Sequence, residues 1–308
     1  MLRLQLFPGK QKKKRLKKTY TNARRLQEIV SILVAYQLTE YVKVLRLDKS
    51  IKILQNIVSR KKALEISKLP EWERIRLALE ELGPTFIKFG QLLSNRTDLL
   101  PEKLIIELVK LQDRVPPVSE KGVRKVIKRE FKKDIDEIFT NFQLKPVASA
   151  SIAQVHRACL PDGKKVAVKV QRPGIERIID TDLEILAALA ARIEKYVPDT
   201  RFFDPSGLIE GFRVQLKIEL NFRRELLHLQ KFDNIFRGKQ NKIFVPQTYA
   251  DYCTRRVLTM DFVEGVKVST LKSQAKLQYD EKVLAQRVAD LMMEQIFIHG
   301  FFHADPHP

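Results

Sequence analysis

This 308-residue sequence has only two cysteines, and it shows no long apolar run and no leader segment. Its two cysteines, Cys159 and Cys253, are too few and too far apart for a disulfide framework or a zinc site, which suits a reducing compartment. No stretch reaches the roughly 18 apolar residues of a spanning helix, and the longest candidate, residues 29–38, has about half that length. The first residues lack the charge-then-apolar order of a signal peptide. We therefore expect a cytoplasmic protein without a transmembrane segment.

Acidic residues are scarce in the first 62 positions, which hold 17 basic and 3 acidic residues and so +14 of the net charge of +20. Because most of the excess lies in one arm, it favours contact with an anionic membrane surface, and no nucleic acid is expected as a partner. A solubilising tail is the structural alternative. An apolar stripe follows the basic run and either lies on a membrane or packs in the core; it comprises Leu26, Ile29, Val30, Leu33, Val34 and Leu38.

Helical patterns dominate the next part of the chain. A helix that starts at Pro70 meets Gly83-Pro84, which ends it and begins the next. Glycine inside a helix costs about 1 kcal/mol relative to alanine, so Gly90 predicts the close approach of another backbone. Other helices are expected at 45–69, 102–111 and 120–130.

Two short strands within residues 145–158 and 166–171 are joined by a Pro-Asp-Gly turn. Strand alternation places Val166, Val168 and Val170 on one face and Lys169 on the other, across from the Ala/Ser-rich segment 148–151. This layout is typical of a nucleotide site, where a strand lysine binds the phosphates and the preceding loop covers them. A solvated strand lysine is the alternative. Alanine and serine resist the positive φ angles that glycine adopts, so this loop should cradle phosphates less closely than a Gly-rich one.

A long helix is expected to begin at Asp204-Pro205 and to contain both Glu219 and Glu225. Six residues turn a helix through about 240° net, so only one of the two carboxylates should pair with Lys169. Further strands are expected at 243–249 and 256–263, and a final amphipathic helix at 282–298. The second strand leads to Gly265, which suits an adenine-binding hinge formed by backbone groups.

Three of the five histidines lie in the last ten residues, around Asp305. His303, Asp305 and His307 would share a face of an extended chain and could ligate zinc or iron, but the neighbouring prolines disfavour a regular strand. The preferred interpretation is a catalytic loop in which Asp305 accepts the proton of an attacking hydroxyl or positions a water. No metal ligand is assigned.

In this order the motifs resemble the UbiB family of atypical kinases, also called AarF or ADCK proteins, over about residues 70–308. The motifs are Lys88-Phe-Gly-Gln91, the Ala-rich segment from Ala148, Val166-Ala-Val-Lys169, Glu219-Leu-Asn with Glu225, Leu258-Thr-Met-Asp261 and His303-Ala-Asp-Pro-His-Pro308. The resemblance implies an α+β, protein-kinase-like two-lobed fold. It divides the chain into a basic helical arm (1–69), a helical extension (70–145), an N-lobe with a helical insert (146–265) and the start of a truncated C-lobe (266–308).

The same resemblance implies binding of ATP or ADP with Mg²⁺, and ATPase or small-molecule kinase activity rather than protein phosphorylation. It implies a role in ubiquinone or related prenyl-lipid metabolism, peripheral to a membrane, with a prenyl-lipid or lipid-headgroup ligand. Carried over to this chain, Lys169, Glu225 and Asp305 look like catalytic residues, with Lys169 and Glu225 forming an ion pair. Lys88 and Gln91 resemble the family's signature gate over the active site, meeting Glu219. Nucleotide contacts would come from Ala148, Ser149, Ala150, Ser151, Lys169, Met260, Asp261 and Val263.

Two departures from the family pattern bear on activity. Asn221 stands where the family has aspartate, which puts a carboxylate role there in doubt. The family's Asn and Asp-Phe-Gly, which hold the metal, would follow Pro308, so Mg²⁺ has no evident protein ligand in this sequence. A catalytically incomplete scaffold that binds nucleotide or lipid is therefore the competing hypothesis. A nucleic-acid binder acting through the basic arm is the third.

Overall fold

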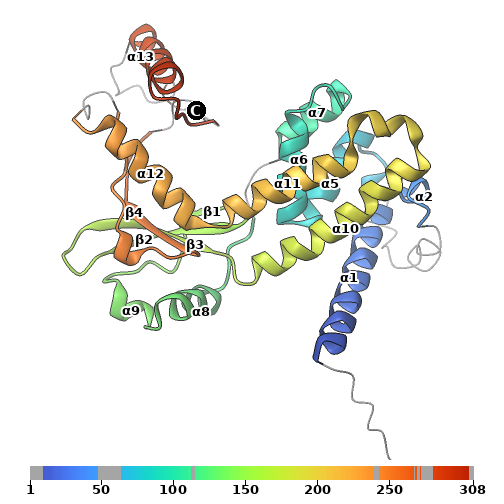
Figure 1. Cartoon of the computed structure of the whole chain (residues 1–308), viewed down its shortest axis with the longest axis horizontal. Helices are drawn as coiled ribbons and strands as arrows, with labels where there is room; N and C mark the ends of the chain where they lie inside the picture. Colours follow the sequence, from blue (N-terminus) through green and yellow to red (C-terminus); the bar gives the residue numbers. More distant parts are fainter. Residues whose placement is uncertain are drawn as a thin grey trace, which may run out of the picture.

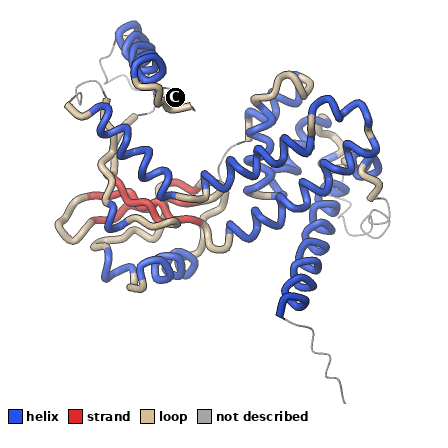
Figure 2. Tube along the Cα trace, in the orientation of Figure 1, coloured by secondary structure: helices blue, strands red, loops and turns tan. Residues whose placement is uncertain are grey.

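A computed structural model describes residues 10–47, 64–111, 115–238, 243–266, 268, 271 and 280–304, without the side chains of 10–20, 198 and 201. Two bodies lie side by side, a four-stranded sheet with its covering helices and a body built of helices (Figure 1). The strands of the described chain all lie in the first body (Figure 2). The chain therefore has an α+β architecture.

The helices and strands of the described chain have the following bounds. The α-helices are α1 (Lys10–Ala35), α2 (Thr39–Val44), α5 (Glu71–Leu82), α6 (Pro84–Ser94), α7 (Glu102–Val109), α8 (Glu120–Phe131), α9 (Ile135–Ile138), α10 (Ile175–Tyr196), α11 (Pro205–Glu219), α12 (Phe222–Phe236) and α13 (Glu281–Met293). The strands are β1 (Ala148–Ser149), β2 (Ala153–Cys159), β3 (Lys165–Gln171) and β4 (Val257–Asp261). Short 3-10 helices cover Pro198–Phe203 and Ala250–Tyr252, and a π-helical turn, Glu294–Ile298, follows α13.

The sheet is an antiparallel meander in the order β1-β2-β3-β4. The Pro-Asp-Gly turn joins β2 to β3 as predicted, and its Gly163 has a φ of 87°, which glycine adopts without strain. Val166, Val168 and Val170 pack with Val257 in a buried cluster beneath α8 and α9. This confirms the predicted alternation, and Lys169 lies on the opposite face, where α12 crosses the sheet (Figure 1).

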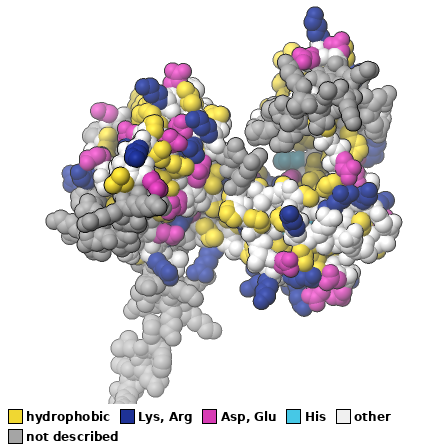
Figure 3. All heavy atoms as spheres, turned by 180° about the vertical axis from the view of Figure 1, so that it is seen from behind, with side chains coloured by type: hydrophobic (Ala, Val, Ile, Leu, Met, Phe, Trp, Pro, Cys, Tyr) yellow, Lys and Arg dark blue, Asp and Glu magenta, His cyan; other side chains and the backbone are white. Residues whose placement is uncertain are grey.

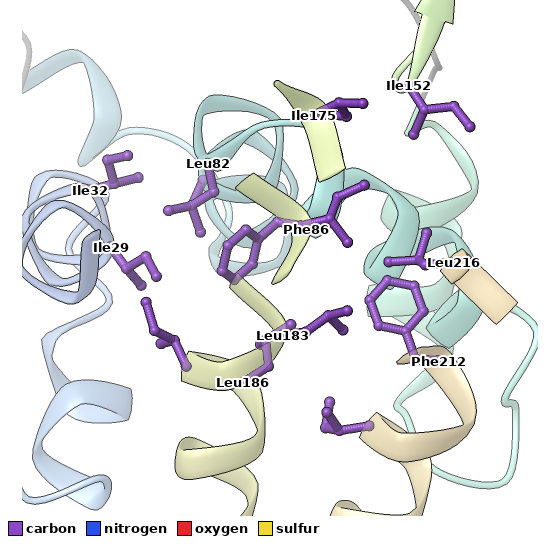
Figure 4. Packing of buried hydrophobic residues seen from close by; sticks show 14 of the residues in the cluster. Ile29, Ile32, Leu82, Phe86, Ile152, Ile175, Leu183, Leu186, Phe212 and Leu216 are labelled. Carbon is purple, nitrogen blue, oxygen red and sulfur yellow. The ribbon is translucent and has the colours of Figure 1, made fainter. Parts of the chain in front are cut away.

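The largest core lies in the helical body and reaches the sheet. It is formed by α1, α5, α6, α10 and α11 together with Phe222 of α12, Leu258 of β4 and Ile152 from the turn between β1 and β2. Ile29 and Ile32 of α1 point toward Leu82 and Phe86 (Figure 4). The apolar stripe of α1 is thus core: Ile29, Val30, Val34 and Leu38 are buried. The sequence left open whether this stripe lies on a membrane or packs in the core. In the structure it packs in the core.

Gly90 in α6 is buried, but its close neighbours are side chains and not another backbone, so that prediction was wrong. A Cβ at this position would lie 2.3 Å from Leu111 Cδ1 and 3.1 Å from Leu79 Cδ1. The two leucines fill the space that a side chain on α6 would need. Glycine here lets α6 lie directly against α5 and α7.

The long helix predicted through Glu219 and Glu225 is two helices. α11 ends at Glu219 and α12 starts at Phe222. Asn221 caps α12, since its side-chain oxygen accepts from the Arg223 amide at 3.3 Å. The Phe222 amide donates to the Arg255 carbonyl at 3.0 Å instead of to the preceding helix. A contact with a distant segment therefore replaces the hydrogen bond that would have continued α11.

The strand predicted at 243–249 is also absent from the described residues, where Thr248 makes only an isolated bridge to Met260. Pro246 has no amide hydrogen, and the Gln247 amide donates to the Asp261 carboxylate at 2.9 Å. The strand predicted at 256–263 is the shorter β4. Most of the helix expected at 45–69 lies outside the described residues. Within the described ranges, no helix is long and apolar enough to cross a membrane.

The face shown in Figure 3 carries Lys and Arg side chains interspersed with Asp and Glu over both bodies. The described part of this face does not form a surface of one charge sign. The concentration of positive charge in the first 62 residues is therefore a property of the sequence and is not seen as a basic patch on the described part of this face.

His156 on β2 is buried and bonded at both ring nitrogens. Nδ1 lies 2.8 Å from the Gln143 carbonyl, so it carries the proton, and Nε2 accepts from the Gln154 amide at 2.8 Å. The Gln154 amide oxygen in turn accepts from the Val118 amide at 2.9 Å, which fixes the side-chain orientation. If the ring were protonated, its Nε2–H would face the N–H of the Gln154 amide, and neither group could accept a hydrogen bond. Burial, partly opposed by the bond to Gln143, lowers the pKa of His156 below its ordinary value of 6.5.

Unfolding should therefore become easier in mild acid. Below about pH 6.5 the unfolded chain binds a proton at this histidine that the folded chain resists, so the free energy of unfolding falls as the pH falls. One proton gives a slope of at most about 1.4 kcal/mol per pH unit. Urea unfolding of the wild type and of His156→Gln between pH 8 and 5 measures this, and the variant should show a shallower dependence. Equal slopes would contradict the assignment.

Candidate active site

Lys169 lies in the middle of the sheet, on β3 between Val155 of β2 and Leu258 of β4. Its ammonium donates to both carboxylate oxygens of Glu225, at 2.9 and 2.8 Å. The side chains of Lys169 and Glu225 are 24% and 37% exposed, so the pair is shielded on one side and open on the other. The predicted partner is therefore the observed one, and the charged pair can be reached by a polar ligand.

Phe222 supports this pair from below and was not singled out by the sequence. It is fully buried at the first position of α12, and the Lys169 nitrogen lies 4.9 Å from the centre of its ring. Glu225 follows one turn later on the same helix. Phe222 therefore contacts the lysine ammonium with its ring, and its packing also fixes the start of the helix that carries Glu225. The only signal for it in the sequence is an aromatic residue directly after Asn221.

The second ion pair joins α6 to the end of α11 within the helical body. The Lys88 ammonium on α6 lies 2.9 Å from Glu219 Oε1, and both side chains are partly exposed, much like those of the first pair. Between the two pairs, the Gln171 side chain donates to the Leu220 carbonyl at 3.0 Å, on the Lys169 face of β3. The break between α11 and α12 thus directs Glu219 to Lys88 and Glu225 to Lys169. Gln91, the other predicted gate residue, donates to the Leu111 carbonyl at 3.2 Å.

The Ala-rich segment is a tight hairpin. Ala148 and Ser149 form β1 and pair with Val155 and Gln154, and the Ala150 amide donates to the Ala153 carbonyl at 2.8 Å. Since Ala148 is the register partner of Val155, and Val155 of Lys169, the hairpin lies two strands away from the lysine in the same sheet. Ser151 is buried, and its hydroxyl has no hydrogen-bond partner among the described residues.

The proposed hinge residues lie at the end of β4 and do not all face the same way. Met260 is the register partner of Ala167 and shares the face of Lys169. Asp261 points to the other face, where its carboxylate accepts from the Tyr249 hydroxyl at 2.7 Å. Burial and this hydrogen bond raise the pKa of Tyr249 to about 12. Val263 is exposed after the strand ends. A contact of Asp261 with the base would thus come from its backbone.

Asp305, with His307, lies outside the described residues, and the structure describes only His303 and Ala304 of that motif. The His303 amide donates to the Gln295 side chain at 2.9 Å, and Phe301 packs on Phe232 of α12 with ring centres 4.8 Å apart. The motif therefore begins against α12, the helix that carries Glu225. Among the described residues no three metal-ligating side chains come together.

A strand lysine paired with a helix glutamate on a small antiparallel sheet is typical of the nucleotide-binding part of protein kinases. Residues 110–308 match the ABC1 atypical kinase-like domain, and the chain belongs to this family of UbiB, AarF and ADCK proteins. It is 40% identical over 289 residues to the probable protein kinase UbiB of Pseudomonas fluorescens (strain Pf0-1). It is 36% identical over 288 residues to the UbiB protein of Marinobacter nauticus. These matches cover 92% and 94% of this chain.

The chain spans about half the length of the curated relatives it matches, 53% for the first and 52% for the second. Among solved structures it is similar to Rv3197 from Mycobacterium tuberculosis, determined as a complex with erythromycin. The sequence identity is 28% and the TM-score 0.54, and the match covers 75% of this chain and 57% of that one. The kinase-like α+β fold predicted from the sequence is thereby confirmed.

Proposed function

We propose that this chain binds ATP or ADP between Lys169 and the Ala-rich hairpin, and that the longer protein transfers or hydrolyses the γ-phosphoryl group. Lys169 would bind the phosphates and Glu225 would hold its ammonium in place. Met260, Val263 and the backbone of Asp261 would border the base, and Asp305 would accept the proton of the attacking group. Mg²⁺, when bound, would neutralise charge on the phosphates. The described residues offer it no ligand cluster, so this requirement is proposed from the family alone.

The observation that carries the proposal is the two-oxygen contact of Glu225 with the Lys169 ammonium. A single strand lysine held by a carboxylate, shielded by Phe222 and still open on one side, provides a fixed positive charge for an anionic ligand. An ordinary solvated lysine would be mostly exposed and would not be held at both carboxylate oxygens.

The setting of the reaction is also a proposal. The names of the relatives support a role in ubiquinone or related prenyl-lipid metabolism, with a prenyl lipid or lipid headgroup as ligand. The charge of the first 62 residues supports a place at an anionic membrane surface, peripheral to the bilayer. On the face shown in Figure 3, the described basic side chains are interspersed with acidic ones, so this face does not favour nucleic acid as a partner.

Nucleotide binding can be tested by thermal unfolding with ATP or ADP, each with and without Mg²⁺. At a nucleotide concentration about 100 times the Kd, binding should stabilise the folded chain by about 2.7 kcal/mol and raise the midpoint by about 4 °C or more. Lys169→Ala removes the phosphate contact and should weaken binding at least about tenfold. Lys165→Ala is the matched control, because Lys165 is an exposed lysine on the same face of β3.

Three results would separate the hypotheses. Equal midpoint shifts in both variants would contradict the role of Lys169. No shift in the wild type would contradict nucleotide binding. A normal shift without phosphoryl turnover in the longer protein, Mg²⁺ included, would favour the alternative of a scaffold that binds nucleotide or lipid without catalysis.

A further inference from the structure

Arg172 follows β3 directly and holds two segments that are distant in sequence. Its Nε donates to the Ala150 carbonyl at 2.9 Å, and its Nη2 donates to the Ser149 hydroxyl at 2.9 Å. From the other edge of the guanidinium, Nη1 donates to the Pro116 carbonyl at 2.9 Å and Nη2 to the Val115 carbonyl at 3.2 Å. One side chain therefore bonds the Ala-rich hairpin on one side and the linker 115–117 on the other.

Two neighbouring side chains strengthen this junction. The Ser149 hydroxyl donates to the Val115 carbonyl at 2.8 Å, so the hairpin also contacts the linker directly. Gln154 accepts from the Val118 amide at 2.9 Å just after the linker. The Arg172 amide itself donates to the Ile152 carbonyl at 2.9 Å, which fixes the arginine relative to the hairpin turn. The junction is thus an ordered network and not a single contact.

The junction depends on geometry more than on charge. Among the described residues, the acceptors of Arg172 are all neutral oxygens, and burial lowers the pKa of its guanidinium. The planar guanidinium presents donors in several fixed directions, whereas a lysine ammonium at this place could not reach all four acceptors. A lysine should therefore fail to replace this arginine, although the charge is unchanged.

The chain just before the linker contacts α6, the helix that carries Lys88 and Gln91. Gln91 on α6 donates to the Leu111 carbonyl, and Arg172 binds the carbonyls of Val115 and Pro116 four and five residues later. Leu111 is thereby bonded to α6, and the linker is bonded to the Ala-rich hairpin.

We propose that Arg172 is a positioning residue that latches the Ala-rich hairpin to the linker 115–117 and so joins the nucleotide site to the helical extension. Its effect on nucleotide affinity rests on the proposed function, whereas the latch itself does not. With the latch intact, the hairpin is ordered before the nucleotide arrives. Without it, binding must first order the hairpin, and the affinity falls.

The test compares Arg172→Met and Arg172→Lys with the wild type by amide hydrogen exchange and by ADP and ATP titration. In both variants, exchange of the Ala150 and Val118 amides should rise together about tenfold or more, and nucleotide affinity should fall about tenfold. Ser149→Ala, which keeps the arginine, should give a smaller rise in the same two segments. Arg124→Met on α8 is the matched control, because that arginine is exposed and pairs with exposed Asp136.

Unchanged exchange at Ala150 and Val118 in folded Arg172→Met would overturn the latch, as would full restoration by Arg172→Lys. A rise confined to one of the two segments would overturn the coupling between them. Absence of nucleotide binding in the wild type would refute the proposed function, and the exchange measurements would still decide the latch.

Discussion

Replacing Arg25 by methionine is expected to destabilise the fold by about 3–5 kcal/mol, because it leaves the buried Asp182 carboxylate without its cation. Asp182 on α10 is 1% exposed, and Arg25 on α1 contacts both its oxygens, at 2.8 and 3.3 Å. The Arg25 guanidinium also donates to the Leu82 carbonyl at 2.6 Å, and the Thr85 hydroxyl donates to Asp182 at 2.7 Å. This network ties α1 to α10 and to the junction of α5 with α6.

Urea unfolding measures the effect, with Arg24→Met as the control, since Arg24 is the exposed neighbour on the same helix. The control should change stability by less than about 0.5 kcal/mol. Arg25→Lys, which keeps the charge but loses the forked geometry, should fall between the two and remain folded if methionine is not tolerated. In the double variant Arg25→Met/Asp182→Asn, removal of the buried charge should recover part of the loss. A cost for Arg25→Met as small as that of the control would refute this account.

Phe222→Ala is expected to cost about 3–5 kcal/mol and to loosen the Lys169–Glu225 pair at the same time. The ring is fully buried in the main core, directly beneath the lysine ammonium. Its removal opens a cavity at the first turn of α12, one turn before Glu225. Nucleotide affinity should therefore fall by more than the fraction of unfolded protein accounts for.

The control for this variant is Phe202→Ala, because that phenylalanine is 90% exposed and the same atoms are removed. Its stability should change by less than about 0.5 kcal/mol. Phe222→Leu should be milder and provides a folded protein for titration with ADP. Normal nucleotide affinity in a folded Phe222 variant, with only its stability reduced, would show that the residue is core alone and does not position the pair.

The faces of the central strands were predictable because alternation along a strand is a local property. Val168 and Lys169 had to lie on opposite faces whatever the rest of the chain did. Helical geometry also predicted that only one of Glu219 and Glu225 would pair with Lys169. Only Glu225 does so, although the continuous helix on which that argument rested is broken. The break itself was not predictable, because it depends on the Arg255 carbonyl, which arrives more than thirty residues later in the chain.

The apolar stripe of α1 shows the other limit of sequence reasoning. Residues such as Ile29 and Val30 form the same pattern whether the helix lies on a membrane or on another helix. Which of the two arrangements forms depends on whether α5 and α10 pack against α1. The local sequence of α1 does not contain that information. The Arg172 junction was missed for a similar reason, since its acceptors are backbone carbonyls that any residue could supply.

The short segment between Glu219 and Glu225 has a further consequence for how this part of the chain can vary. Its two ends are fixed by ion pairs to lysines from different parts of the fold, and one added or deleted residue would rotate the following helix by about 100°. Substitutions within the segment leave that spacing intact. Apart from the buried Phe222, the length of this segment should therefore be the property that natural or engineered variants preserve here.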